Sequence, residues 1–346
     1  MSLIERDSFN HPKVICFGEA LMDRLGPLGG NPALDQPVQD CLGGAPANAA
    51  CAMAKLGVDV AFVGCLGDDQ IGQTFRQLME EQGINISCLQ IDQHLPSRTV
   101  LVKRDDKGER SFAGFYGDKG KGFADSAIRL NDLVKNFSSL TSQVAWLLVG
   151  TIPLSTKASA ESLLWILEYA SNSGIKIALD INWRPIFWNE EFDPNQGPDQ
   201  FALNSVQPLL NKASLIKLSK EEAKWFFNSF DPVVISDSLS NKPDVVVTDG
   251  AKPLRWLIGG LNGTFDVPNV PLIVDTTGAG DSFTAGLICQ MMRFESLDKN
   301  DENLKKMLAF SSACGAIVCS GSGAIDPQPT YEEVERFLSL EFGGIN

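Results

Sequence analysis

The stretch Asp275-Thr276-Thr277-Gly278-Ala279-Gly280-Asp281-Ser282-Phe283 organises the interpretation of the chain, because apolar residues precede it and an apolar helical segment, residues 285–292, follows it. The pattern predicts a strand that ends at Val274, a glycine-rich turn, and a helix that begins near Asp281. Small side chains allow the backbone N–H groups of residues 278–280 to converge with the N-terminus of that helix. We therefore expect an anion hole at this turn.

The carboxylate of Asp281 has two explanations at this point. Aspartate is favoured at helix N-caps, so a structural role would suffice. A carboxylate beside an anion hole also suits a base that activates a hydroxyl group toward a phosphoryl group. The chain contains no G-x-x-x-x-G-K-[ST] motif, which excludes a P-loop.

A second glycine-rich stretch, Gly43-Gly44-Ala45-Pro46-Ala47-Asn48-Ala49-Ala50-Cys51-Ala52-Met53-Ala54-Lys55-Leu56-Gly57, lies near the N-terminus. Its leading glycines allow a ligand to approach the backbone closely, and its small residues predict a helix that ends at Gly57. Asn48 is the polar exception at the start of this helix. It caps a tightly packed helix or contacts a ligand, and the stretch alone does not decide between these roles.

Short apolar runs alternate with helix-length amphipathic segments along the chain. The predicted strands are residues 14–19, 59–66, 145–150, 176–181, 215–218 and 245–248, and the predicted helices are residues 73–82, 158–172 and 220–228. The strand runs are continuously apolar, as expected when helices cover both faces of a parallel sheet. The pattern therefore predicts a doubly wound, mostly parallel α/β fold.

One segment breaks this alternation and predicts a small antiparallel sheet. Residues 97–103 and 109–115 alternate between polar and apolar side chains around a turn-rich connection, which is typical of a hairpin. Residues 34–42 supply a further strand. We assign 34–42 and 97–117 to a β lid, and 1–33, 43–96 and 118–346 to an α/β core. The hairpin is either a lid, which would also offer a dimer surface, or an ordinary surface hairpin.

Composition excludes several classes of function. The 346 residues include 29 Lys+Arg against 43 Asp+Glu, a net charge of 29 − 43 = −14, which argues against nucleic acid and membrane partners. Eight cysteines without a C-x-x-C pair and only two histidines argue against a zinc site or a His-based triad. The N-terminal residues do not form a signal peptide, and the apolar runs stay below the roughly 18 residues of a membrane span. We expect a cytoplasmic protein.

Residues 43–57 and 275–288 together resemble the two signatures of the ribokinase-type, or PfkB-type, carbohydrate kinases, and the opening Gly18-Glu19-Ala20-Leu21-Met22-Asp23 is similar to that family's first strand. Within this family, the sequence is most similar to fructokinases. The resemblance implies a ribokinase-like fold and phosphoryl transfer from ATP, with Mg²⁺ and K⁺, to a sugar hydroxyl, with D-fructose as the leading substrate. The alternatives are a ketodeoxygluconate kinase, a ribose or nucleoside kinase, or an inactive kinase-like scaffold.

The resemblance also implies roles for matching residues. Those implied in catalysis are the base Asp281 and the anion hole of Gly278, Ala279 and Gly280. Those implied in sugar binding are Asp23, Gly43, Gly44, Asn48 and Arg184, the last of which could instead form a surface ion pair. Those implied at the nucleotide are Thr248, Gly250, Ser312 and Lys217, with Glu222 acting on Mg²⁺ through water. Those implied at a monovalent cation are Asp275, Thr277, Val318 and Gly323.

Three departures from the family pattern favour the scaffold alternative. Ser219 stands where asparagine is usual, Gly117 stands where fructokinases carry arginine, and Gly321-Ser322 replaces a basic pair. The intact glycine turn and the retained acidic residues favour an enzyme. A dehydrogenase is excluded because no G-x-G-x-x-G motif follows the first strand.

Overall fold

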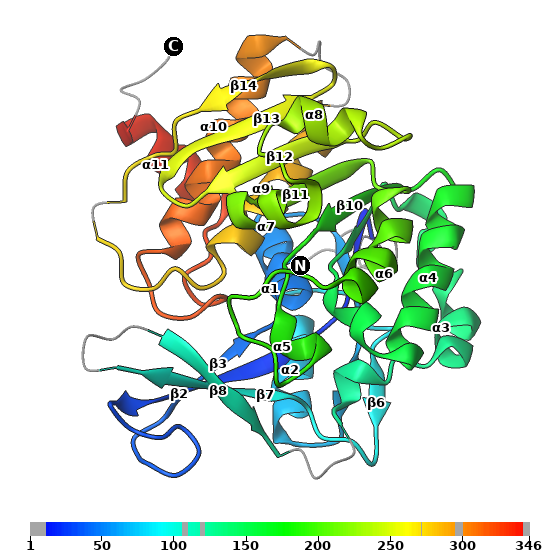
Figure 1. Cartoon of the computed structure of the whole chain (residues 1–346), viewed down its shortest axis with the longest axis vertical. Coiled ribbons are helices and arrows are strands. Elements are labelled where there is room, and N and C mark those ends of the chain that lie inside the picture. Colours follow the sequence, from blue (N-terminus) through cyan, green and yellow to red (C-terminus); the bar gives the residue numbers. More distant parts are fainter. Residues whose placement is uncertain (1–11, 106–109, 118–121, 271, 295–299, 342–346) are drawn as a thin grey trace, which may run out of the picture.

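An eight-stranded sheet forms the centre of the structure, a computed structural model that describes residues 12–105, 110–117, 122–270, 272–294 and 300–341 (Figure 1). Its strands, in spatial order, are β14 (Leu261–Phe265), β13 (Lys252–Ile258), β12 (Asp244–Asp249), β11 (Leu215–Ser219), β10 (Lys176–Asp180), β9 (Trp146–Val149), β1 (Val14–Phe17) and β4 (Val60–Val63). The six strands from β12 to β4 are parallel, and β13 and β14 add an antiparallel edge. The doubly wound, mostly parallel fold is therefore confirmed.

Helices cover both faces of this sheet because alternate strand residues point to opposite sides. The helices are α1 (Ala45–Lys55), α2 (Gln70–Glu81), α3 (Leu130–Phe137), α4 (Lys157–Asn172), α5 (Pro185–Trp188), α6 (Gln200–Leu210), α7 (Lys220–Phe227), α8 (Pro232–Asp237), α9 (Ala279–Arg293), α10 (Asp301–Val318) and α11 (Tyr331–Glu341). Short 3₁₀ turns are η2 (Ala124–Ser126), η3 (Thr141–Gln143) and η4 (Ile152–Ser155). Helices α3, α4, α6, α7 and α8 share one buried cluster with the sheet, whereas α1, α2, α9 and α10 share the other.

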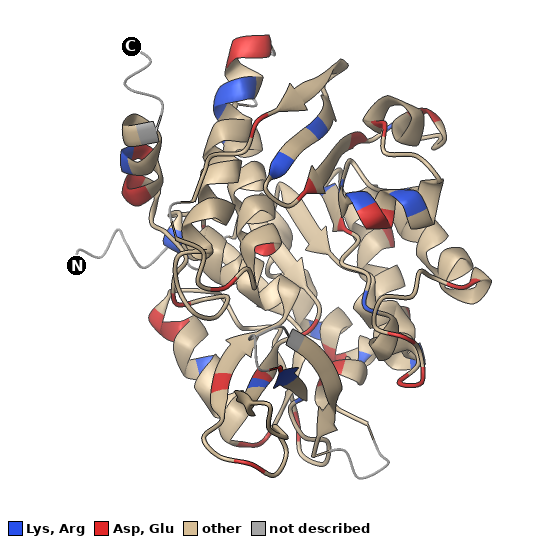
Figure 2. Ribbon diagram, turned by 60° about the vertical axis from the view of Figure 1, so that its left-hand side comes forward, with Lys and Arg blue, Asp and Glu red and all other residues tan. Residues whose placement is uncertain are grey.

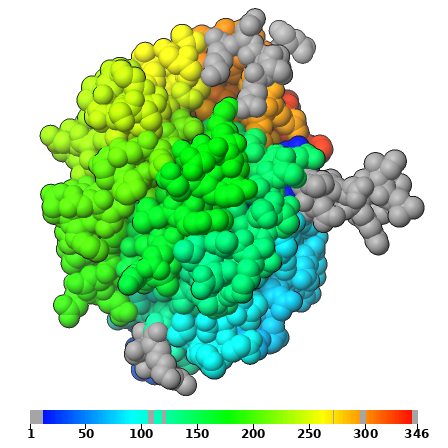
Figure 3. Space-filling view, turned by 90° about the vertical axis from the view of Figure 1, so that its right-hand side faces the viewer, coloured from blue at the N-terminus to red at the C-terminus, as the bar shows by residue number. Residues whose placement is uncertain are grey.

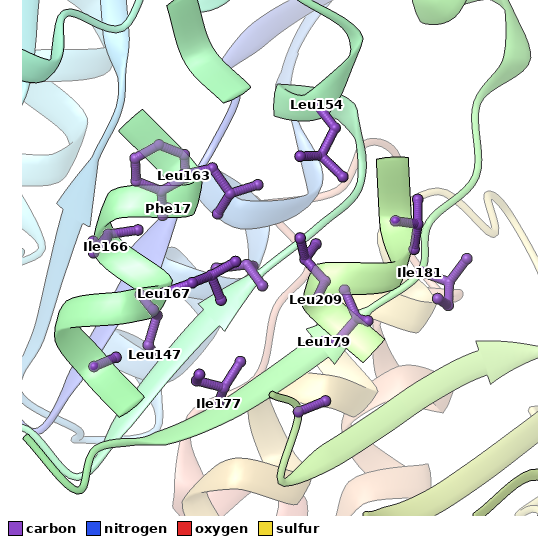
Figure 4. Packing of buried hydrophobic residues seen from close by; sticks show 14 of the residues in the cluster. Phe17, Leu147, Leu154, Leu163, Ile166, Leu167, Ile177, Leu179, Ile181 and Leu209 are labelled. Carbon is purple, nitrogen blue, oxygen red and sulfur yellow. The ribbon is translucent and has the colours of Figure 1, made fainter. Parts of the chain in front are cut away.

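The apolar face of the amphipathic helix predicted at residues 158–172 packs in the first of these clusters. Figure 4 shows Leu163, Ile166 and Leu167 of α4 directed toward Leu147 of β9 and Ile177 of β10. Burying a side chain of this size contributes about 1.5–3 kcal/mol, so this face anchors the helix to the sheet. Figure 3 shows, in a space-filling view, that green segments from the middle of the chain form much of the surface on the side where α3, α4 and α6 lie in Figure 1.

A four-stranded sheet lies beside the carboxyl edge of the large one. Its order is β3 (Gln39–Gly43), β2 (Leu21–Leu28), β7 (Thr99–Arg104) and β8 (Arg110–Tyr116). The two outer pairings are antiparallel, and the central pairing of β2 with β7 is parallel. The turn predicted between the hairpin strands includes residues 106–109, which lie outside the described residues. A separate two-stranded sheet pairs β5 (Cys65–Gly67) with β6 (Gln90–Asp92).

Two boundaries differ from the sequence prediction. Residues 1–33 were assigned to the core, but β2 belongs to the small sheet because the chain leaves the large sheet at Gly18, whose φ is 150°. The predicted strand ending at Val274 is also wrong. Leu272, Ile273 and Val274 are more than half exposed, and the Val274 N–H donates to the Cys319 carbonyl at 2.8 Å. No sheet pairing is recorded there among the described residues.

Charged residues of both signs are interspersed over the described part of the chain (Figure 2). Within that part, none of the helices combines the length and apolar character that crossing a bilayer requires.

Candidate active site

A cavity of about 510 Å³ lies between the carboxyl edge of the large sheet and the small sheet. In open α/β sheets this edge is where ligands bind. The small sheet supplies apolar walls, including Val100, Val102 and Phe112, together with the carboxylate of Asp23. The core supplies a polar wall made by Glu19, Gly44, Asn48, Arg184, Lys217, Thr277, Gly278, Gly280 and Asp281. Two predicted motifs more than 200 residues apart in sequence therefore meet at one cavity.

Asp281 lies in the first turn of α9 and is partly buried. Its Oδ2 accepts a hydrogen bond of 2.8 Å from Asn48 Nδ2 at the start of α1. The N-cap of α9 is Gly278, which has no side chain to cap the helix, so capping does not explain Asp281. Burial and the nearby Asp180 carboxylate raise the pKa of Asp281 to about 6, opposed by Asn48, Lys217 and Arg184. At neutral pH the carboxylate is ionised and able to accept a proton.

The turn before α9 requires glycine at position 278 and leaves little room for a side chain at position 280. Gly278 has φ of 78°, and a Cβ there would lie 2.6 Å from the Cβ of Ala324. A Cβ on Gly280 would lie 3.0 Å from Lys217 Nζ. The start of α9, where the Ala279 N–H donates to the Thr276 carbonyl at 3.3 Å, therefore lies beside a buried ammonium group, which is an anion-attracting arrangement.

Lys217 is held in place by a buried network. Its Nζ lies 3.2 Å and 3.1 Å from the two carboxylate oxygens of Asp180, and Thr284 Oγ1 donates to the same carboxylate at 2.9 Å. Burial alone would lower the pKa of Lys217, but Asp180, Glu222 and Asp281 raise it above its usual value. The side chain is therefore a permanent cation. Neither Asp180, four residues before Arg184, nor Thr284 was expected at this site from the sequence.

Two glycines allow the first motif to approach the cavity closely. A Cβ on Gly43 would lie 2.8 Å from Asp23 Oδ2, so glycine leaves room for that carboxylate, although Gly43 itself does not line the cavity. Gly44 has φ of 101°, and its Cβ would lie 2.6 Å from the Glu19 carbonyl oxygen. Asn48 is buried, and its Oδ1 has no hydrogen-bond partner. An unpartnered buried oxygen at a cavity wall points to a polar ligand.

Arg184 is exposed at the cavity wall, where its Nη1 donates to the Trp183 carbonyl oxygen at 2.9 Å. No ion pair of Arg184 is recorded in the described part of the chain, so the surface ion pair considered above is not supported. Lysine would offer one point charge here, whereas the guanidinium offers a planar set of donors to an anionic or hydroxyl-rich ligand.

Glu222 lies outside the cavity wall, and backbone N–H groups already bind both of its oxygens. Trp183 N–H donates to Oε1 and Ser219 N–H donates to Oε2, each at 2.7 Å. Ser219 in turn caps α7 with its hydroxyl group, which completes a capping box. The departure from asparagine to serine therefore preserves the cap. Gly117 has φ of 88°, so an arginine there would be conformationally strained.

Three of the predicted cation-site residues, Asp275, Thr277 and Gly323, are joined by hydrogen bonds next to the glycine turn. Asp275 Oδ1 accepts hydrogen bonds from the N–H group and hydroxyl of Thr277, at 3.0 and 2.7 Å, and its Oδ2 accepts one from Gly323 N–H at 2.9 Å. The Val318 carbonyl accepts from Gly321 N–H at 3.2 Å. These oxygen donors suit a hard or monovalent cation. Among the described residues, no group of three or more His, Cys, Asp or Glu side chains could hold a metal ion.

Of the predicted nucleotide residues, Lys217 lines the cavity, whereas Thr248, Gly250 and Ser312 lie outside its wall. Thr248 is near the end of β12, and Gly250 follows in a turn with φ of 59°, at the same edge of the sheet as Lys217. Ser312 lies within α10 at 2% exposure, and its hydroxyl has no hydrogen-bond partner. Their role at a nucleotide stays a prediction. Glu19, by contrast, lines the cavity and was missed, although a glutamate directly after a buried apolar strand was a visible signal.

Comparison with known proteins gives consistent results. The sequence model described as "pfkB family carbohydrate kinase" matches residues 11–331. Probable fructokinase-4 of Arabidopsis thaliana is 31% identical over 329 residues, which cover 94% of this chain and 96% of the relative. The structure of a fructokinase with bound ATP from Xylella fastidiosa superposes with a TM-score of 0.77 at 25% identity and covers 96% of this chain and 99% of that one.

A further solved structure is similar over the whole chain. The fructokinase of Vibrio cholerae O395, in its fructose-, ADP- and calcium-bound form, has a TM-score of 0.77 at 26% identity, covering 96% of this chain and all of that one (100%).

Proposed function

The chain belongs to the pfkB family of carbohydrate kinases and is a fructokinase-like sugar phosphotransferase, and from that premise we propose that it transfers the γ-phosphoryl group of ATP to D-fructose, forming fructose 6-phosphate. The observation that carries the proposal is the position of Asp281, which lies in the cavity beside the N-terminus of α9 and within reach of Asn48. Ketodeoxygluconate, ribose and nucleosides are less favoured because the similar curated proteins are fructokinases.

In the proposed reaction, Asp281 accepts the proton of the attacking sugar hydroxyl. The sugar oxygen forms a bond to the γ-phosphorus while the bond to the β–γ bridging oxygen breaks, and ADP leaves. The pKa of about 6 leaves Asp281 ionised at neutral pH yet basic enough to take a proton. An inactive scaffold would have no chemical need for this group, so the scaffold alternative is not favoured.

The glycine turn would stabilise the charge on the transferred group. Gly278, Gly280 and Lys217 line the same cavity as Asp281, and Ala279 lies between the two glycines. Phosphoryl transfer depends mainly on positioning and on such fixed charges, and a well-placed donor contributes about 10²–10³ in turnover.

The remaining predicted residues would hold the substrates. We propose that Asp23, Gly43, Gly44, Asn48 and Arg184 bind or shape the site of the sugar, and that Thr248, Gly250 and Ser312 lie at the nucleotide. Mg²⁺ would neutralise phosphate charge, with Glu222 contributing through water. A K⁺ ion near Asp275, Thr277, Val318 and Gly323 would support the anion hole. The homodimer through the lid and the cytoplasmic location stay predictions.

The test is ADP formation with Mg·ATP and K⁺ over a panel of fructose, glucose, ribose, ketodeoxygluconate and adenosine. Turnover with fructose at least tenfold above every other acceptor is expected. Preference for ketodeoxygluconate would reassign Arg184 to a substrate carboxylate. ATP binding without turnover on any acceptor would contradict the proposed function and restore the scaffold alternative.

A further inference from the structure

Glu19 is a buried carboxyl group in the wall of the cavity that neither family signature includes. It follows β1 and precedes β2, so it lies where the chain crosses from the large sheet to the small one. The side chain is 3% exposed. Its Oε1 accepts a hydrogen bond of 3.1 Å from the N–H group of Ala45, and its Oε2 is buried without any partner.

The surroundings of Glu19 disfavour its ionised form. The charged groups that face it are two further carboxylates, Asp125 of η2 and Asp281 of α9, while α1 contributes only the Ala45 N–H group. Burial, first of all, and these like charges raise the pKa of Glu19 to about 8. The cations of the cavity, Arg184 and Lys217, favour the ionised form of Asp281, and neither is among the charged groups that shift the pKa of Glu19. Glu19 is therefore a neutral carboxylic acid at neutral pH, with one O–H group to donate.

A second unpartnered atom belongs to the same cavity wall. Glu19 and Asn48 both line the cavity. The Oδ1 of Asn48 is buried without a partner, while its Nδ2 donates to Asp281. Carboxylates and amide oxygens can only accept, so Asp23, Asp281 and Asn48 Oδ1 satisfy the protons of sugar hydroxyls but not their lone pairs. The O–H group of Glu19 supplies a donor to this acceptor-rich wall.

We propose that Glu19 is a specificity-determining residue that donates a hydrogen bond from its protonated Oε2 to one hydroxyl oxygen of the bound sugar, while its Oε1 fixes the start of α1. The proposal rests on the proposed function, since it assigns a contact within the same sugar site. A site that hydrogen-bonds a substrate hydroxyl rejects the analogue that lacks it, because the buried polar group is then left unpaired.

The decisive variant is Glu19→Gln. Glutamine keeps an acceptor for the Ala45 N–H group and a donor at the second position, but it does not titrate. With fructose, the wild-type kcat/KM should fall about tenfold per pH unit above pH 8, and Glu19→Gln should stay within fivefold of wild type at pH 7 while losing that alkaline fall. Chromatographic measurement of ADP avoids the pH profile of coupling enzymes. Glu161→Gln, on the exposed surface of α4, is the matched control and should keep the wild-type profile.

Deoxyfructoses identify the hydroxyl. Wild type and Glu19→Gln should both lose about tenfold in kcat/KM on one deoxyfructose, whereas Glu19→Met should be weaker on fructose and lose that discrimination. If Glu19→Gln retains the alkaline fall and no deoxyfructose distinguishes Glu19→Met from wild type, the proposal is wrong although the fructokinase assignment stands. If wild-type protein does not use fructose at all, the proposed function fails first. Should Glu19→Met not fold, the profile of Glu19→Gln decides alone.

Discussion

Gly278→Ala is expected to remove most phosphoryl transfer, while the same substitution at Gly57 leaves it intact. The two glycines share a backbone conformation, with φ of 78° and 80°. Alanine in this left-handed region costs about 1–2 kcal/mol at either position, so both variants should lose that much unfolding free energy. They differ in space: a Cβ on Gly57 meets nothing within 4 Å, whereas a Cβ on Gly278 lies 2.6 Å from the Cβ and 2.8 Å from the Cα of Ala324.

The clash at Gly278 falls on backbone and must therefore move the anion-binding turn. Ala324 follows Gly323, whose N–H group donates to the Asp275 carboxylate. A shift of residues 323–324 would therefore also disturb Asp275, which precedes the glycine turn. A displacement of the order of 1 Å at a catalytic group costs about 10² in rate. We expect Gly278→Ala to lower kcat by about 100-fold and to leave the KM for fructose within threefold.

The assay compares steady-state ADP formation with urea unfolding for both variants. The unfolding free energies measure the cost of alanine in the left-handed region, which both variants share. A loss of kcat in Gly278→Ala beyond that in Gly57→Ala is then due to the clash at the turn. A Gly278→Ala enzyme with kcat within threefold of Gly57→Ala would refute the assignment of residues 278–280 as the anion hole, because the clash would then fall on a turn with no catalytic role.

Three further predictions concern the charges around the base. The kcat/KM should fall tenfold per pH unit below about pH 6 as Asp281 is protonated, and a flat profile from pH 5 to 7 would count against this base. Asn48→Ala should move this acidic limb to higher pH, because the Asn48 hydrogen bond lowers the pKa of Asp281; an unmoved limb would show that the bond does not matter in solution. Lys217→Gln should lower kcat by about 100-fold, whereas Lys212→Gln, on the surface, should have no effect; equal activities would remove Lys217 from the site.

The parallel core was predictable because its physical signal is local. Runs such as residues 14–17 and 245–247 are apolar at every position, which only a strand buried on both faces requires. Strand β2 gave a weaker signal, since it contains Gly26 and Pro27 and pairs with β7, some 75 residues later. The segment before the glycine turn is apolar like a strand, but apolar character alone does not provide a neighbouring strand to pair with.

The sequence and the family resemblance predicted which residues belong to the candidate site, but not how those residues are arranged in space. Asp281 and Asn48 each stood out locally, but the bond between them joins residues 233 apart in sequence and depends on the whole fold. The position of Glu19 directly after a buried strand was visible in the sequence, but the carboxylates that face it and raise its pKa are brought together only by the fold. The same holds for Asp180, whose partner Lys217 lies on the next strand.

The central claim is that Asp281 takes the proton of the sugar hydroxyl, and Asp281→Asn tests it most directly. Asparagine keeps the size of the side chain and can still interact with Asn48, but it cannot accept the proton. The measurement is single-turnover transfer to fructose, with binding of fructose and of ATP followed by calorimetry. We predict transfer slowed by at least 100-fold with both affinities within threefold of wild type. Transfer within tenfold of wild type would contradict the account.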